Sequence, residues 1–210
     1  MSVLIATPCY QGNLTTALFR SIVGILDLCD REKIDCDVLL LEGEAAIARG
    51  RSNMAATFLR TDYKTFAMID ADIEIDPEDF LKLLRLDKPV RGAAVCLKTS
   101  DHSELLNIYR GGERVKRAEM PADPFEIQFL GAAVMLIERE VIETLSEIDA
   151  LKYHDDVVGD ATHIFAEQVI DHCLLSEDYS FCHRAREFGF SIWCDPTIIC
   201  SHIGPSKWRH

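Results

Sequence analysis

The first hundred residues alternate between short apolar runs and segments whose apolar residues recur three or four positions apart. The runs have the length of strands, and the segments between them have the periodicity of helices. Strands and helices that alternate along a chain form a mostly parallel sheet with helices on both faces. We expect strands over residues 3–6, 37–41, 64–69 and 90–97, and helices from a cap at Asn13 or Thr15 to about Cys29, over 45–59 and from Pro77 onward.

The second half is more varied. An apolar run, FEIQFLGAAVMLIE, predicts a strand, and its Gly131 could allow a close approach of two backbones. Two polar stretches, 98–124 and 150–168, predict long loops, which in compact domains are often functional. We expect helices over 139–147 and 177–188, and a small antiparallel part with strands over 191–194 and 198–201.

Composition limits the class of protein. A chain of 210 residues with 48% hydrophobic and 27% charged residues predicts one globular domain over residues 1–210. A net charge of −13 argues against binding to nucleic acids or anionic membranes. No apolar run is long enough to span a membrane, and the first residues predict a strand, so we expect no membrane insertion and a cytoplasmic location.

The chain has eight cysteines without regular spacing. In a reducing compartment this pattern predicts free, mostly buried thiols. A zinc site made of Cys and His is disfavoured because the paired spacing of such sites is missing.

The stretch YKTFAMIDADIEIDPED (63–79) places acidic residues directly after an apolar strand. Carboxylates crowded at a strand end repel one another unless a positive charge lies there. Asp70 and Asp72, two residues apart in an extended chain, point to the same face and could hold Mg²⁺ or Mn²⁺. Ligands of open parallel sheets bind at the carboxyl ends of strands, where Thr7 to Tyr10 and Glu42 to Glu44 also emerge.

The acidic stretch has two other interpretations, a calcium-binding loop and a helix start. A calcium-binding EF-hand loop fails because its sixth position is Ile75 instead of glycine and its twelfth is Leu81 instead of glutamate. A helix start explains Asp76, Glu78 and Asp79, which complement the positive end of a helix. It leaves Asp70 and Asp72 unexplained.

Six segments, in order over nearly the whole chain, carry a resemblance to a known family. They are ATPCY (6–10), ARGRSN (48–53), DAD (70–72), FLGAAVM (129–135), SEDYSF (176–181), and DP with CSH (195–196 and 200–202). The chain resembles the GT-A glycosyltransferases, nucleotide-sugar-dependent enzymes with a Rossmann-like core and a D-x-D metal motif.

The resemblance implies a role for each segment. Residues 1–97 would form the nucleotide-sugar-binding half and 98–210 the acceptor-binding half. Asp178 would be the catalytic base of an inverting enzyme, and an Mn²⁺ or Mg²⁺ ion would be held by Asp70, Asp72 and His202. Asp70 would either share the ion or bind the ribose. The donor, a UDP-sugar, would contact Thr7, Pro8, Tyr10, Glu42, Arg51, Asp70, Ala71 and Asp72.

Within the family, the chain resembles glycosyltransferase domains that chlorella-infecting viruses encode. This implies transfer of a rhamnose- or glucose-type sugar to a glycan acceptor during capsid glycan synthesis, in the host cytoplasm if a virus encodes the chain. The oligomeric state is not predicted.

Several alternatives stay open at this point. A nucleotidyltransferase also combines such a sheet with acidic metal ligands, although residues 7–12 lack the Lys or Arg that a triphosphate site needs. A glycan-binding module without catalysis is a third option. Arg51 could lie on a solvated helix face. The basic residues Arg110, Arg114, Lys116 and Arg117 predict either a lid over the donor or a solvated loop, and Lys207 and Trp208 could close the pocket.

Overall fold

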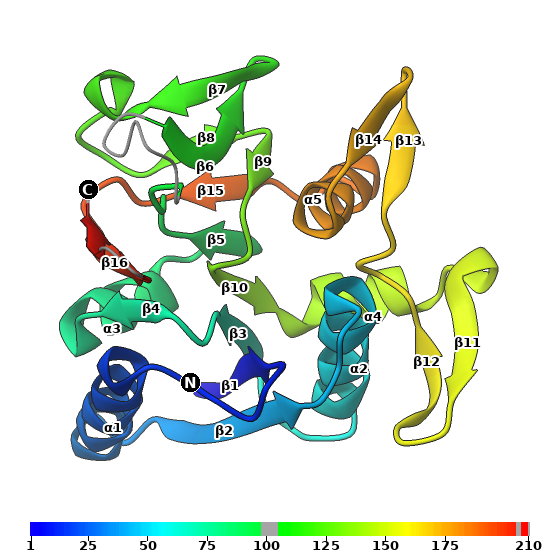
Figure 1. The fold of residues 1–210 in the computed structure, drawn as a ribbon, viewed down its shortest axis with the longest axis horizontal. Helices are drawn as coiled ribbons and strands as arrows, with labels where there is room; N and C mark the ends of the chain where they lie inside the picture. Colours follow the sequence, from blue (N-terminus) through cyan, green and yellow to red (C-terminus); the bar gives the residue numbers. More distant parts are fainter. Residues whose placement is uncertain (98–104, 205–206, 210) are drawn as a thin grey trace.

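A seven-stranded central sheet organises the chain in a computed structural model that describes residues 1–97, 105–204 and 207–209 (Figure 1). The strand order is β2-β1-β3-β10-β5-β15-β8. The strands are β1 (Ser2–Cys9), β2 (Asp35–Glu42), β3 (Thr65–Ile69), β5 (Val90–Gly92), β8 (Phe125–Ile127), β10 (Val134–Glu138) and β15 (Ile192–Cys194).

The sheet is mostly parallel, as predicted. Strand β1 runs parallel to both β2 and β3, and β15 runs parallel to β5. Strand β10 is reversed and lies between β3 and β5, and β8 is reversed at the edge. A buried run such as residues 134–137 suits either direction, so the sequence does not reveal that a late strand separates two early ones.

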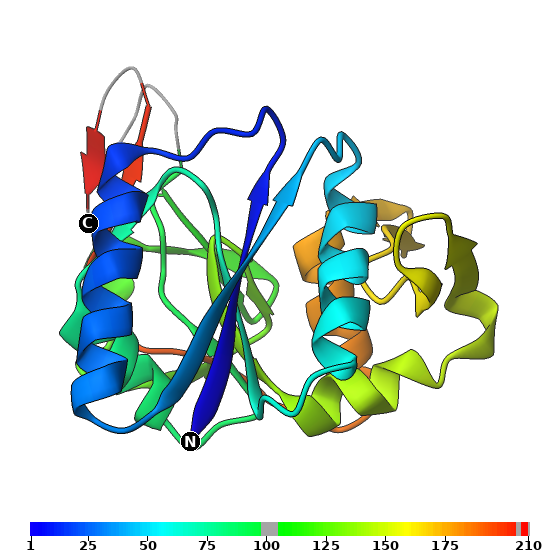
Figure 2. The same ribbon diagram turned by 90° about the horizontal axis from the view of Figure 1, so that it is seen from below.

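Helices cover both faces of the sheet (Figure 2). Helices α1 (Thr16–Arg31) and α3 (Pro77–Arg85) pack on one face, and α2 (Ile47–Leu59), α4 (Arg139–Ser146) and α5 (Glu177–Glu187) pack on the other. Each face has its own apolar core. All five helices match predicted ones within a few residues, and Thr15 caps α1 by accepting a hydrogen bond from the Leu18 amide at 3.2 Å.

Small antiparallel sheets surround this layer. They comprise β4 (Ile73–Ile75) with β16 (Cys200–Ile203) and β17 (Lys207–Arg209); β6 (Leu105–Arg110) with β7 (Glu113–Lys116) and β9 (Phe129–Leu130); β11 (Lys152–Asp155) with β12 (Gly159–Thr162); and β13 (Gln168–Ile170) with β14 (Cys173–Leu175). Single 3-10 turns cover Arg117–Glu119 and Asp149–Leu151.

Five sequence predictions need correction. The strand predicted over 90–97 covers only Val90–Gly92. The 98–124 loop is largely the β6–β7 hairpin, apart from residues 98–104, which lie outside the described residues. The 150–168 loop is mainly the β11–β12 hairpin. The strand predicted over 125–138 is divided into β8, β9 and β10, and the strand at 191–194 belongs to the central sheet. These hairpins resemble loops in sequence because their strands are short and the few buried residues of β6 and β7, such as Leu106, Ile108 and Val115, stand among polar ones.

A buried arginine lies at the end of the sheet opposite the carboxyl ends of β1, β2 and β3. Arg91 in β5 is 1% exposed and ion-paired with Glu138 at 2.7 Å. Its guanidinium also donates to the carbonyl oxygens of Leu83, Leu84 and Lys88, at 2.7 to 3.1 Å. Burial lowers the pKa of Arg91. The side chain therefore adds hydrogen bonds to two carbonyls in the last turn of α3 and to one in the segment that follows it.

Replacing Arg91 with alanine should destabilise the fold by about 3–5 kcal/mol, because it removes the buried partner of the Glu138 carboxylate and three hydrogen bonds to carbonyls. Urea unfolding measures this. Arg85→Ala is the control, since Arg85 pairs with Glu32 where both side chains are well exposed, and it should cost about 0–1 kcal/mol. Equal losses in the two variants would contradict the role given to Arg91.

Candidate functional site

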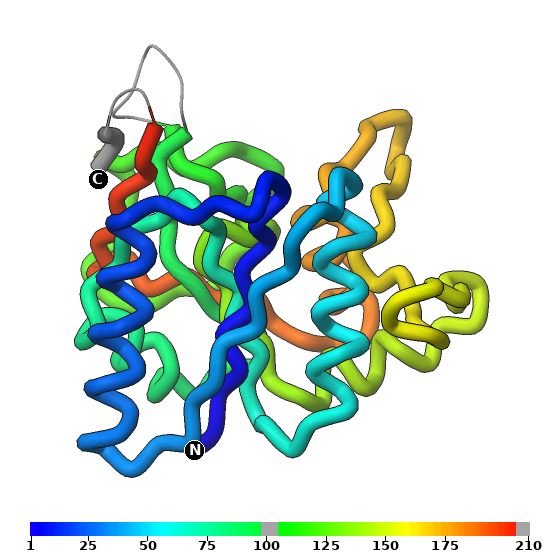
Figure 3. Tube along the Cα trace, turned by 60° about the horizontal axis from the view of Figure 1, so that its bottom comes forward, coloured from blue at the N-terminus to red at the C-terminus, as the bar shows by residue number. Residues whose placement is uncertain are grey.

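The carboxyl ends of three neighbouring strands meet at one edge of the sheet. Strand β1 ends at Cys9, which is directly opposite Glu42 at the end of β2, and β3 ends beside them at Ile69. Figure 3 shows that the segments following β1 and β2 lie at this same edge. Polar strand ends from separate parts of the chain are thus gathered in one place.

The end of β1 combines buried and exposed groups. Thr7 is fully buried, and its hydroxyl has no hydrogen-bond partner among the described residues. Pro8 is half-buried, whereas Tyr10 is 59% exposed and Glu42 is exposed. A tight turn closed by the Gly12 amide on the Cys9 carbonyl at 2.8 Å follows. The exposed tyrosine ring is available for stacking against a planar ligand.

The acidic stretch has two parts. Asp76 caps α3 by accepting from the Glu78 amide at 2.9 Å, with Pro77 in the first turn, so the helix-start interpretation is correct for this part. Before it, the backbone from Asp70 to Ile73 forms a tight turn, closed by the Ile73 amide on the Asp70 carbonyl at 3.1 Å. The carbonyl of Ala71 accepts from the Thr15 amide at 2.9 Å, which ties the turn to the start of α1.

His202 lies beside Asp72. Strand β16 pairs with β4 so that His202 is opposite Ile73, and the Ile203 amide donates to the Asp72 carbonyl at 2.7 Å. The His202 Nε2 atom is 3.4 Å from Asp72 Oδ1, and Nδ1 is 3.0 Å from the Cys96 carbonyl oxygen. A carbonyl can only accept, so Nδ1 carries a proton. The other ring nitrogen, Nε2, therefore faces the Asp72 carboxylate, and these two groups could hold a cation at this place.

The donors suit a hard divalent ion only in part. Within the described residues no group of three or more His, Cys, Asp or Glu side chains is placed to hold a metal, so Asp70 does not complete a three-ligand set with Asp72 and His202. One carboxylate and one imidazole fit Mn²⁺ or Mg²⁺ if water and a substrate phosphate supply the other ligands.

Asp70 is engaged by a buried arginine instead. Arg51 in α2 is 4% exposed, so the interpretation as a solvated helix face is wrong. Its guanidinium contacts Asp70 Oδ1 at 2.8 Å and also the Glu177 carboxylate at the start of α5. Burial raises the pKa of Glu177, although the charge of Arg51 opposes this. One cation thus joins carboxylates from the two halves of the chain.

Asp178 lies next to this ion pair and is held by hydrogen bonds. Its Oδ2 accepts from the Ala132 amide at 3.3 Å, and its Oδ1 accepts from the Tyr179 amide at 2.8 Å and from the Ser176 hydroxyl. Ser176 stands at the N-cap position of α5 but donates to Asp178 instead of capping the helix. These donors fix the direction of the carboxylate.

The remaining candidates lie around this edge. Arg110, Arg114 and Lys116 belong to the β6–β7 hairpin, and Arg117 begins the 3-10 turn that follows it. Arg114 donates to the Leu106 carbonyl and to the Tyr109 hydroxyl. Lys207 and Trp208 lie in β17, whose backbone pairs Trp208 with His202. Neither placement tests the proposed lid or pocket closure.

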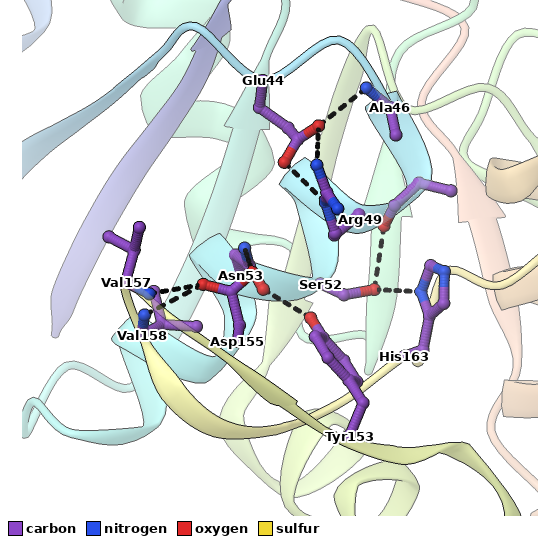
Figure 4. Close-up of polar contacts among 11 residues, drawn as sticks. Glu44, Ala46, Arg49, Ser52, Asn53, Tyr153, Asp155, Val157, Val158 and His163 are labelled. Atoms are coloured by element: carbon purple, nitrogen blue, oxygen red, sulfur yellow. Dashed lines mark hydrogen bonds and ion pairs between the residues drawn. The ribbon is translucent and has the colours of Figure 1, made fainter.

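A polar network that the sequence did not predict joins α2 to the β11–β12 hairpin (Figure 4). Asn53 donates to Asp155 at 3.0 Å and accepts from the Tyr153 hydroxyl. Ser52 Oγ is 3.0 Å from His163 Nδ1. Asn53 was part of a motif assigned to the donor site, whereas here it positions a hairpin. Partners this far apart in sequence give no local signal.

Comparisons with known proteins support the fold. No family model matches the chain, and no curated protein matches it. The A197 protein from STIV is 17% identical with a TM-score of 0.58, over 97% of this chain and 86% of that one. A glycosyltransferase involved in glycosylation of the major capsid of PBCV-1 has 11% identity and a TM-score of 0.39, over 69% and 63%. The inositol-1-phosphate CTP transferase from T. maritima has 10% identity and a TM-score of 0.49, over 96% and 88%.

The expected fold class, a mostly parallel α/β sheet of Rossmann-like type, is therefore confirmed, and the likeness to A197 extends over nearly the whole chain. At 17% identity this likeness establishes the fold and not the activity. No helix of the described residues is long and apolar enough to cross a membrane.

The histidine of the network should make stability depend on pH. Burial, with help from the charges of Arg184 and Arg49, lowers the pKa of His163. The unfolded chain therefore takes up this proton first, at a pH of about 6.5. The stability contribution of the neutral ring is complete above that pH and is lost as the pH falls below it.

We expect His163→Gln to lose less stability than the wild type between pH 7.5 and pH 5.5. Urea unfolding of both proteins at the two pH values measures the difference and cancels the other titrating groups. The same pH dependence in both proteins would show that His163 does not contribute.

Proposed function

We propose that the protein is a metal-dependent, inverting glycosyltransferase that moves a sugar from a UDP-sugar to a hydroxyl group of a glycan. The observation that carries this proposal is the gathering, at one sheet edge, of Asp72 with His202 on one side and of Asp178 on the other. The buried contacts of Arg51 with Asp70 and Glu177 connect the two sides. Sugar transfer needs a cationic site for the leaving diphosphate and a base for the acceptor.

Asp72 and His202 would hold the divalent ion. When bound, the ion neutralises negative charge that develops on the leaving diphosphate. The chain's own residues supply the remaining functions at this side. Exposed Tyr10, which follows the strand that carries Thr7 and Pro8, would stack on the uracil ring. Exposed Glu42, at the end of the neighbouring strand β2, would accept from the base or the ribose.

Asp178 would act as the base. As the acceptor oxygen forms its bond to C1 of the sugar, its proton passes to Asp178, and the bond from C1 to the diphosphate oxygen breaks. Attack from the side opposite the leaving group inverts the configuration at C1. The hydrogen bonds from Ala132 and Tyr179 hold the carboxylate in one orientation.

The finer parts of the proposal rest on the resemblance of the sequence motifs. These are a rhamnose- or glucose-type donor sugar, an acceptor that belongs to a viral capsid glycan, and a reaction in the cytoplasm, of the host cell if a virus encodes the chain. All eight cysteines are free, which favours a reducing compartment for the protein.

The first test is calorimetric titration of UDP into the protein, with Mn²⁺ and then with EDTA. We expect binding that requires the metal and that weakens at least about tenfold in Asp72→Ala, since even outer-shell partners of metal ligands contribute that much. Glu78→Gln is the control, because this exposed residue of the same acidic stretch serves the helix start. Metal-independent binding, or equal losses in both variants, would contradict the metal site.

A second test addresses the base. Asp178→Asn should lower kcat by about 10²- to 10⁴-fold and leave UDP affinity unchanged, because the base acts on the acceptor. Asp171→Asn, in the exposed turn between β13 and β14, is the control and should be fully active. NMR of the product should show inverted configuration. Retention at C1 would exclude this role for Asp178.

The same assays separate the alternative functions. A nucleotidyltransferase would release pyrophosphate from a nucleoside triphosphate and a sugar phosphate, which the lack of Lys and Arg in residues 7–12 argues against. A glycan-binding module would bind glycans without turnover in the wild type.

A further inference from the structure

Arg51 lies between two carboxylates of its own chain. It comes from the middle of α2, whereas Asp70 follows β3 and Glu177 begins α5. Its side chain is 5% exposed, and those of Asp70 and Glu177 are 27% and 14% exposed. Both terminal nitrogens of the guanidinium are used in these contacts. The group is thus enclosed by the protein and turned toward carboxylates.

The charges favour this arrangement strongly. Burial opposes the charge of Arg51, yet the carboxylates of Asp70, Glu177 and Asp178 outweigh it and raise its pKa. Removing the guanidinium would leave several carboxylates to repel one another in a poorly solvated place. A lysine would keep the charge but could not reach two carboxylates with a planar fork.

A second connection joins the same two segments. The Ala133 carbonyl accepts from the Asp70 amide at 3.0 Å, and the neighbouring Ala132 amide donates to Asp178 Oδ2 at 3.3 Å. The backbone of residues 132–133 therefore contacts both the acidic turn and Asp178. The guanidinium of Arg51 joins the side chains Asp70 and Glu177 of these same segments.

We propose that Arg51 is a positioning residue. It fixes the acidic turn, which carries Asp72, relative to the start of α5, which carries Asp178. It acts through Asp70 and Glu177 and does not bind the diphosphate. This inference rests on the proposed function for its effect on turnover, and on the contacts alone for its effect on the structure. We call the contacts of Arg51 with Asp70 and Glu177 the brace. The two aspartates of the D-x-D motif then have different tasks, since Asp70 belongs to the brace and Asp72 to the ion site.

The kinetic test uses Arg51→Lys. We expect kcat to fall about 100-fold, because a displacement of about 1 Å between the two sides of a site has that effect. The affinity for UDP with Mn²⁺, measured by calorimetry, should change by less than about threefold. Arg91→Lys is the matched control: it also replaces a buried, carboxylate-paired arginine, at the opposite edge of the sheet, and should lower stability without changing turnover per folded molecule.

Two kinetic outcomes would overturn the proposal. A loss of UDP affinity greater than about tenfold, with a raised KM, would identify Arg51 as a diphosphate ligand. Unchanged kcat per folded molecule would show that Arg51 contributes to stability and does not position the site.

Amide hydrogen exchange tests the brace without any activity. In Arg51→Lys the amides of Ile73, Ala132 and Tyr179 should exchange at least about tenfold faster, while those of β1 keep their rates; Arg91→Lys should leave all of them unchanged. Wild-type protein that neither binds UDP nor transfers sugar would reject the proposed function, and this exchange pattern would still support the brace. Unchanged exchange in Arg51→Lys would reject the brace whatever the activity.

Discussion

A single guanidinium, enclosed between carboxylates from the two halves of the chain, determines the geometry of this sheet edge. The chain carries a net charge of −13, and the edge gathers Asp70, Glu177 and Asp178. Carboxylates in a poorly solvated site are stabilised by a positive charge that is a permanent part of the protein. Arg51 supplies this charge from the buried face of α2. The guanidinium therefore holds the turn at Asp70 and the start of α5 at Glu177 together.

Much of the fold could be predicted because it depends on local patterns. The apolar periodicity of the five helices, the cap at Thr15 and the proline that opens α3 are each visible within a few residues. The two parts of the acidic stretch were also separable, since Asp76 precedes a proline at a helix start and Asp70 follows a buried strand. His202 lies 3.4 Å from Asp72, and its role as a metal ligand stays a prediction from the family resemblance.

The rest depends on pairings between distant segments. The insertion of β10 between β3 and β5 cannot be predicted from an apolar run that suits either strand direction. The β6–β7 and β11–β12 hairpins are polar on their exposed sides and looked like loops. Arg51 has two partners that lie 19 and 126 residues away. A charged residue on a helix gives no sign of burial until its partners are placed.

The two aspartates of the acidic turn have different electrostatic partners. Asp70 is paired with an arginine that is part of the fold, whereas Asp72 faces an imidazole whose Nδ1 donates to the Cys96 carbonyl. Under the proposed function, Asp72 and His202 would hold the ion, and Asp70 would stay paired with Arg51 whether or not an ion is bound. The buried arginine therefore separates the charge balance of Asp70 from the ion site, because its positive charge is a fixed part of the fold.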